Sequence, residues 1–176
     1  MANTYTLISS TTLASANGTV TISSIPSTYS DLIIAISARM GSGSGTSPYA
    51  VNITINGDGA SNYSRTPLFT ETGVVYSLRT ANAANVLVEK ALAGPDQTAN
   101  SFSNIQVYLP GYTSSSSKPF FISAGNSHAL AQNDGRNGIH ACLWRNSATI
   151  SSITFATAGN TMAAGSSFYV YGIKNS

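Results

Sequence analysis

The sequence contains very little charge. Only 8% of its 176 residues are Asp, Glu, Lys or Arg, and the formal net charge is +2. Globular proteins carry about 25% charged residues, so the polar surface must come from Ser, Thr, Asn and Gln. The basic residues are scattered singly and form no stripe, which argues against binding to a nucleic-acid backbone. The recurring apolar runs and the small net charge exclude an intrinsically disordered chain.

Cysteine and long apolar segments are also scarce. Cys142 is the only cysteine, so an internal disulfide is excluded and packing or assembly must hold the fold. The opening stretch MANTYTLISS has neither the basic region nor the apolar region of a signal peptide. No apolar run approaches the roughly 20 residues of a membrane helix. We therefore expect synthesis in a reducing cytoplasm and no membrane partner.

A hydrophobic period of two runs through the chain. VNITIN and SNIQVYL alternate apolar and polar residues, as half-buried strands do. Turn-forming stretches such as SANG, NGDG and NDGRNG separate about eleven such segments. ANAANVLVEKALAG is rich in helix formers but is ended by Gly94-Pro95, and we predict a strand over Asn85–Lys90. The pattern predicts an all-β, antiparallel, jelly-roll-like β-sandwich in one domain over residues 1–176.

Three segments, DLIIAISARM, IHACLWR and SFYVYGI, are apolar on both faces. A strand of an isolated antiparallel sandwich normally exposes one polar face, and monomers rarely expose large apolar patches. A neighbouring subunit is therefore favoured over a loop of the same chain as the cover, and we predict a homo-oligomer. The candidate interface or core residues in these strands are Ile33, Trp144, Phe168, Tyr169, Val170 and Tyr171.

The carboxyl-terminal stretch ITFATAGNTMAAGSSFYVYGIKNS indicates two strands joined by a Gly- and Asn-rich loop. We predict that the last strand pairs with the ISSITF strand through this loop, because an unpaired exposed edge would invite aggregation. The second face of the last strand is expected to meet another subunit or an internal sheet.

One stretch, SHALAQNDGRNGIH, resembles a catalytic or metal site in composition. It holds His128, Asp134 and His140, and two histidines with one carboxylate can bind a metal. Ser127 beside His128 also allows a Ser–His–Asp set. The turn-rich QNDGRNG favours Asp134 as a turn residue, and His140 lies in a predicted strand, which favours packing. We predict no catalytic, metal or cofactor site and no enzymatic activity.

Asp58 and the loop tyrosines can each be interpreted either as ligand-binding or as structural residues. Asp58 in NGDGASN lacks the further carboxylates of a calcium loop and is interpreted as part of an Asn-Gly hairpin turn. Exposed tyrosines stack on sugar rings and at protein interfaces, whereas tyrosine also suits strand ends. The tyrosines in or beside predicted loops are Tyr49, Tyr63, Tyr76, Tyr108 and Tyr112.

The stretch YTLISSTTLASANGTVTISSIPSTYSDLIIAISAR resembles the opening of a group of small all-β structural proteins of tailed bacteriophages. ANSFSNIQVYLPGY, SSSKPFF and ITFATAGNTMAAGSSFYVYGI resemble later blocks of that group. The resemblance spans nearly the whole chain and is weakest at Thr70–Ala93 and His128–His140. Members are virion components: head decoration (cement) proteins, head fibres, and tail-fibre or receptor-binding modules. No catalytic or ligand-binding residues come with this resemblance.

The resemblance implies a location in the virion and a role in its architecture. The first hypothesis is a capsid decoration protein, with a trimer favoured, whose partner is the major capsid protein. Binding only the assembled shell would stabilise that shell by mass action. The alternative is a tail-fibre or receptor-binding module that recognises a host surface glycan through loop tyrosines. A hydrolase ranks last.

Overall fold

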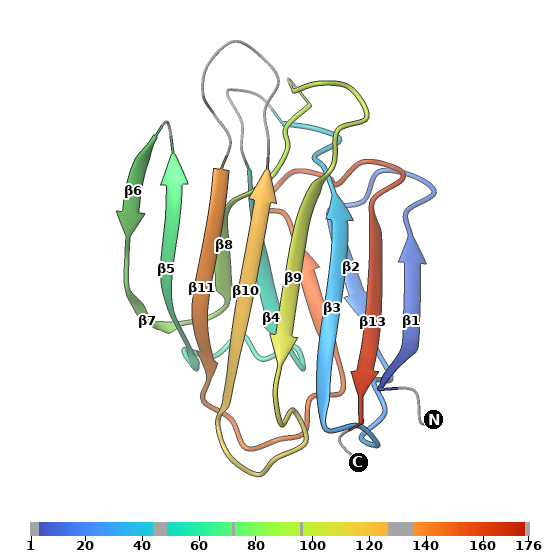
Figure 1. The fold of residues 1–176 in the computed structure, drawn as a ribbon, viewed down its shortest axis with the longest axis vertical. Coiled ribbons are helices and arrows are strands. Elements are labelled where there is room, and N and C mark those ends of the chain that lie inside the picture. The colour runs from blue at the N-terminus through green and yellow to red at the C-terminus, as the bar shows by residue number, and fades with distance from the viewer. Residues whose placement is uncertain (1–3, 44–48, 72, 96, 127–135, 175–176) are drawn as a thin grey trace.

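The computed structural model describes residues 4–43, 49–71, 73–95, 97–126 and 136–174. Thirteen strands form two antiparallel sheets, one of nine strands and one of four, which stack face to face (Figure 1). This confirms the all-β antiparallel sandwich, whereas jelly-roll connectivity stays a prediction. In the described part of the chain, no helix is long and apolar enough to cross a membrane.

The nine-stranded sheet lies in front in Figure 1 and runs in the order β1-β13-β3-β9-β10-β11-β5-β6, with β7 also paired to β5. Its strands are β1 (Tyr5–Thr12), β3 (Asp31–Ala38), β5 (Tyr63–Glu71), β6 (Val74–Ser77), β7 (Thr80–Ala83), β9 (Ser103–Leu109), β10 (Lys118–Asn126), β11 (Arg136–Trp144) and β13 (Ser167–Ile173).

The four-stranded sheet lies behind the larger one and runs in the order β2-β12-β4-β8. Its strands are β2 (Thr19–Ile22), β4 (Tyr49–Ile55), β8 (Val86–Leu92) and β12 (Ile153–Ala156). The strand predicted over Asn85–Lys90 is therefore confirmed as β8. Val86 and Val88 are fully buried in it, and this packing outweighs the helix propensity of the surrounding residues.

The core fills the space between the two sheets. Leu32 and Ile34 point inward from alternate positions of β3, and the buried Ile53 belongs to the same core from the smaller sheet. Phe155 of β12 and Phe168 of β13 join the layers, with ring centroids 5.5 Å apart. Both sheets therefore contribute to one continuous apolar cluster.

The NGDG stretch forms the tight turn that its sequence predicts. Asn56 and Gly57 both have positive φ, at 53° and 66°, and the amide of Asp58 donates to the carbonyl of Ile55 at 2.9 Å. Two consecutive left-handed residues form the tight turn for which Asn-Gly is preferred. The predicted hairpin is wrong, however, because β4 before the turn lies in the four-stranded sheet and β5 after it lies in the nine-stranded sheet.

The predicted pairing of the last two strands is wrong. β13 lies between β1 and β3 in the larger sheet, whereas β12 pairs with β2 and β4 in the smaller one. The loop between them crosses from one sheet to the other instead of closing a hairpin. This arrangement places Phe168 against Phe155 across the core rather than beside it in one sheet.

Candidate interaction surface

The exposed apolar side chains gather on the nine-stranded sheet. Ten of the eleven large ones lie in its strands, and the other, Leu78, lies between β6 and β7. The described residues of the four-stranded sheet contribute none of them. They are Tyr5, Leu7, Leu68, Val74, Val75, Tyr76, Leu78, Tyr108, Phe121, Ile139 and Tyr169.

Strand register aligns several of these side chains into one transverse line. We call this line the apolar row, and it crosses β1, β13, β3, β9 and β10 on the side away from the core, which we call the outer face. Its members are Leu7, Tyr171, Ile33, Tyr108 and Phe121, each paired with the next. Leu7 is 51% exposed and Phe121 43% exposed, so both ends of the row reach solvent.

The outer face is almost free of charge. Among the described residues, Asp31 is the only Asp, Glu, Lys or Arg at an outward-facing strand position of this sheet. Its carboxylate accepts hydrogen bonds from the Tyr108 hydroxyl and the Gly111 amide, both at 2.9 Å. The hydrogen bond to Asp31 raises the pKa of Tyr108, which keeps that phenol neutral. A partner would therefore meet apolar, hydroxyl and amide groups on this face. The single carboxylate, Asp31, already accepts hydrogen bonds from within the protein.

A groove of about 470 Å³ lies on the same face beside the apolar row. Its floor is low because Ser123 and Gly125, at outward-facing positions of β10, carry a small side chain or none. Its walls include Leu68 and Ile139, which are both 46% exposed. The remaining lining residues are Phe69, Thr70, Val75, Asn104, Ala124 and Asn137.

The six candidate interface or core residues divide between the two sides of the sheet. Phe168, Val170 and Trp144 are buried in the core. Ile33, Tyr169 and Tyr171 lie on the outer face, where Tyr169 is 36% exposed.

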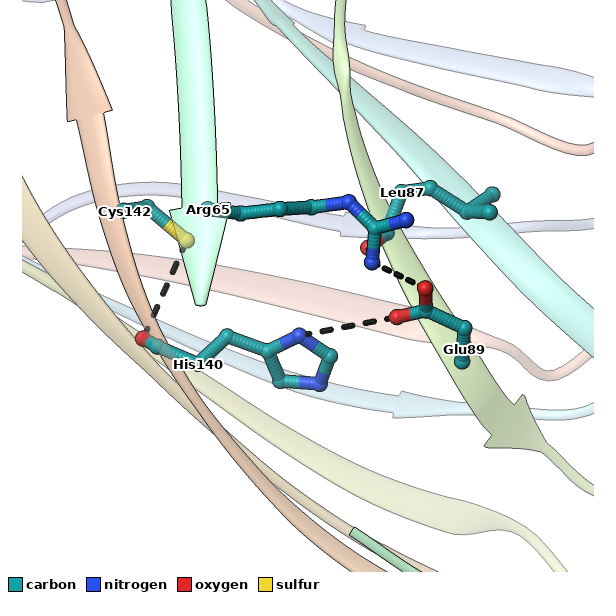
Figure 2. A network of polar contacts seen from close by, with 5 residues as sticks. All are labelled: Arg65, Leu87, Glu89, His140 and Cys142. Atoms are coloured by element: carbon teal, nitrogen blue, oxygen red, sulfur yellow. Dashed lines mark hydrogen bonds and ion pairs between the residues drawn. The ribbon is translucent and has the colours of Figure 1, made fainter. Parts of the chain in front are cut away.

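The predicted metal or catalytic set is only partly described. Ser127, His128 and Asp134 lie outside the described residues. His140 is fully buried in β11 and points between the sheets, toward Glu89 of β8. Figure 2 shows Arg65 of β5 and His140 approaching the two oxygens of the Glu89 carboxylate from different sides.

A buried ion pair joins the two sheets. Arg65 forms an ion pair with Glu89 and also donates to the Leu87 carbonyl at 2.9 Å. His140 Nδ1 lies 3.7 Å from Glu89 Oε2, and both imidazole nitrogens lack a hydrogen-bond partner within the described structure. Burial lowers the pKa of His140 to about 4, partly offset by Glu89, so the ring is neutral at pH 7.

The contacts among Arg65, Glu89 and His140 have a structural role, not a catalytic one. Burial raises the pKa of the Cys142 thiol to about 12, so it is protonated at neutral pH and a poor nucleophile. His140 and Cys142 are each less than a tenth exposed, which keeps substrates away from them. No group of three or more His, Cys, Asp or Glu side chains gathers in a metal-binding arrangement among the residues described.

The Asp58 carboxylate is occupied by hydrogen-bond donors of the protein, which is not the arrangement of a cation site. Its carboxylate accepts from Trp144 Nε1 at 2.7 Å, from Asn62 Nδ2 at 2.9 Å and from the Ala60 amide at 2.9 Å. The hydrogen bonds from Asn62 and then Trp144 lower the pKa of Asp58. The carboxylate thus anchors the Asn-Gly turn to the end of β11.

The loop tyrosines do not form a common exposed set. Tyr63 and Tyr112 are fully buried, and their hydroxyls donate to the carbonyls of Ile55 and Pro26. Tyr76 is exposed and stacks on Phe69, with ring centroids 5.4 Å apart. Tyr108 belongs to the apolar row, and Tyr49 packs against the core. Sugar stacking by Tyr63 or Tyr112 is therefore excluded by burial.

Sequence reasoning missed Phe121, the groove and the Arg65–Glu89 pair. KPFFISAG carries a signal for Phe121, since adjacent phenylalanines in a strand point to opposite faces. The groove carries no local signal because it depends on Ser123 and Gly125 of β10 lying beside Ile139 and Asn137 of β11.

Comparison with family models, with curated proteins and with solved structures found no match to this chain.

Proposed function

We propose that this protein is a structural component of a bacteriophage virion, a capsid decoration protein that binds the assembled head and stabilises it. The observation that carries the proposal is the apolar and almost uncharged outer face of the nine-stranded sheet. Monomeric proteins rarely leave such a face in water, and an assembly component has neighbours to cover it. The resemblance to small all-β virion proteins of tailed phages adds support.

Stabilisation of the head would follow from binding alone. A protein that binds the assembled shell and not its separated subunits shifts the equilibrium toward the shell by mass action. We propose a homo-oligomer, with a trimer favoured, whose partner is the major capsid protein. The compact two-sheet sandwich suits this role, since decoration needs a folded block rather than an extended fibre.

A tail-fibre or receptor-binding module that recognises a glycan remains the alternative. The structure offers it little support, because two of its five candidate tyrosines are buried and Tyr108 hydrogen-bonds to Asp31. A glycan site in a tail protein would also leave the large apolar outer face without a cover.

Copy number in purified virions tests the proposal. Quantitative mass spectrometry of the intact particle measures this chain against the major capsid protein. We expect a ratio between about one to one and about one to three, as repeated binding over a symmetric shell requires. A ratio that corresponds to only a few chains per particle would contradict the decoration role and favour the tail alternative.

A further inference from the structure

The outer face carries two features of complementary shape. The apolar row ends at Phe121, which projects from the middle strand β10 and is 43% exposed. The groove lies farther along the same strand, at Ser123 and Gly125, and extends from Asn104 of β9 over β11 and β5 to Val75 of β6. A projecting aromatic side chain and an apolar hollow thus lie side by side on one surface.

The charge on this face favours an uncharged partner. Asp31 is its only charged strand residue within the described structure, and that carboxylate already accepts two hydrogen bonds. A basic or acidic partner surface would lose its hydration here and meet no opposite charge. A second outer face meets the requirement, since it is equally neutral and apolar.

The size of the face is sufficient for a stable contact. The seven strands from β1 to β5 span about 29 Å at the usual strand spacing, and strands of about seven residues extend about 23 Å. The resulting face of about 700 Å² is close to the roughly 800 Å² that each partner buries in a standard protein interface.

We propose that the outer face packs on the outer face of a second copy of this chain, with Phe121 of one copy in the groove of the next. The inference rests on the proposal that this face is an assembly surface, and it names the subunit that covers it. Because Phe121 and the groove lie side by side on one face, face-to-face packing puts the Phe121 of each copy in the groove of the other, and the contact closes with two-fold symmetry. This contact joins two copies, and a trimer would need a second, different contact.

Single lysines on the outer face test this packing in the purified protein. Phe121→Lys places a charge at the end of the row, and Ile139→Lys places one in the groove wall. Thr21→Lys adds the same charge to the exposed outer side of the four-stranded sheet and is the matched control. Sedimentation velocity reports the mass, and circular dichroism with thermal melts reports folding. The second site keeps the test decisive if one variant fails to fold.

We expect the unaltered protein and Thr21→Lys to sediment as two or more chains, and both outer-face variants to dissociate more than about tenfold more readily. An unaltered protein that is monomeric at about 50 µM, well above the Kd of a typical specific interface, would overturn the inference. An oligomer insensitive to both outer-face lysines would also overturn it. The virion ratio is a separate readout, so self-association can fail while the decoration role holds, and the reverse.

Cross-linking identifies the contact itself. The native Cys142 is buried, so introduced thiols at exposed positions are the reactive ones. A mixture of Phe121→Cys and Leu68→Cys proteins treated with a short bis-maleimide should give a covalent heterodimer. A mixture of Phe121→Cys and Thr21→Cys proteins should not. Equal yields in both mixtures would contradict a Phe121-to-groove contact.

Discussion

At the residue scale, His140 makes folding sensitive to acid. Its pKa is near 6.5 in the unfolded chain and about 4 in the folded one, where burial opposes the charge despite Glu89. The contribution of His140 to the free energy of unfolding is therefore fully present above about pH 6.5. It is lost as the pH drops toward 4, because the unfolded chain binds the proton more readily. We expect a loss of about 3 kcal/mol over that window from this residue.

Urea unfolding of His140→Leu and of the unaltered protein, at about pH 7 and about pH 4.5, measures this contribution. The carboxylates titrate in both proteins, so the difference in their pH dependence isolates His140. We expect the variant to lose much less stability on acidification. Parallel losses in the two proteins would show that His140 does not titrate in this range.

Arg65 and Glu89 form the other residue-scale test. Their side chains are only 9% and 13% exposed, so removing one leaves a buried charge without its partner. We expect Arg65→Met to lower the free energy of unfolding by about 3–5 kcal/mol. The double variant Arg65→Met/Glu89→Leu removes both charges and should recover most of that loss. Equal losses in the single and double variants, measured by urea unfolding, would contradict the pairing.

At the scale of the element, β13 separates a core face from an exposed face. Phe168 is 1% exposed and Tyr169 is 36% exposed. We expect Phe168→Ala to cost about 3–5 kcal/mol of unfolding free energy because it opens a cavity. Tyr169→Ala, the neighbouring control, should cost less than about 1 kcal/mol. Both are measured at low protein concentration, where association contributes least, and a reversed order would mean that the strand faces the other way.

The same strand shows how far sequence reasoning reaches. The alternation in SFYVYGI separated Phe168 and Val170 from Tyr169 and Tyr171, because side-chain direction along a strand is a local property. It did not say which pair faces the core, and the structure buries Phe168 and Val170. The predicted partner of the strand was wrong, because pairing depends on contacts far apart in sequence. Here those partners are Tyr5–Thr12 and Asp31–Ala38.

The candidate surface also combines a local pattern that the sequence shows with strand pairing that it does not show. Strands with two apolar faces indicated Ile33, Tyr169 and Tyr171 as interface or core candidates, without saying which face of each strand is the outer one. The sequence did not indicate that the strands place five such side chains in one row. That alignment comes from register, which pairs Ile33 with Tyr108 and Tyr108 with Phe121 across separate strands.

At the scale of the whole molecule, association through a neutral face should depend little on salt. Screening weakens only contacts between charges, whereas sulfate strengthens apolar burial. We expect the association constant to change less than about threefold between about 0.05 M and about 1 M sodium chloride, and to rise in ammonium sulfate. Sedimentation velocity across these salts measures it, and a tenfold or greater weakening in sodium chloride would point to a charged interface elsewhere.

The proposed decoration role predicts that the virion covers the nine-stranded sheet and leaves the four-stranded sheet in solvent. The four-stranded sheet presents hydroxyl-bearing residues such as Thr21 and Thr154 to solvent, and the nine-stranded sheet presents the apolar row. A cryo-electron microscopy map of the native virion, into which the sandwich is fitted, measures this directly. We expect protein density against the outer face of the nine-stranded sheet and solvent outside the four-stranded one. A fit with the apolar row open to solvent and the four-stranded sheet covered would contradict an assembly role for the outer face.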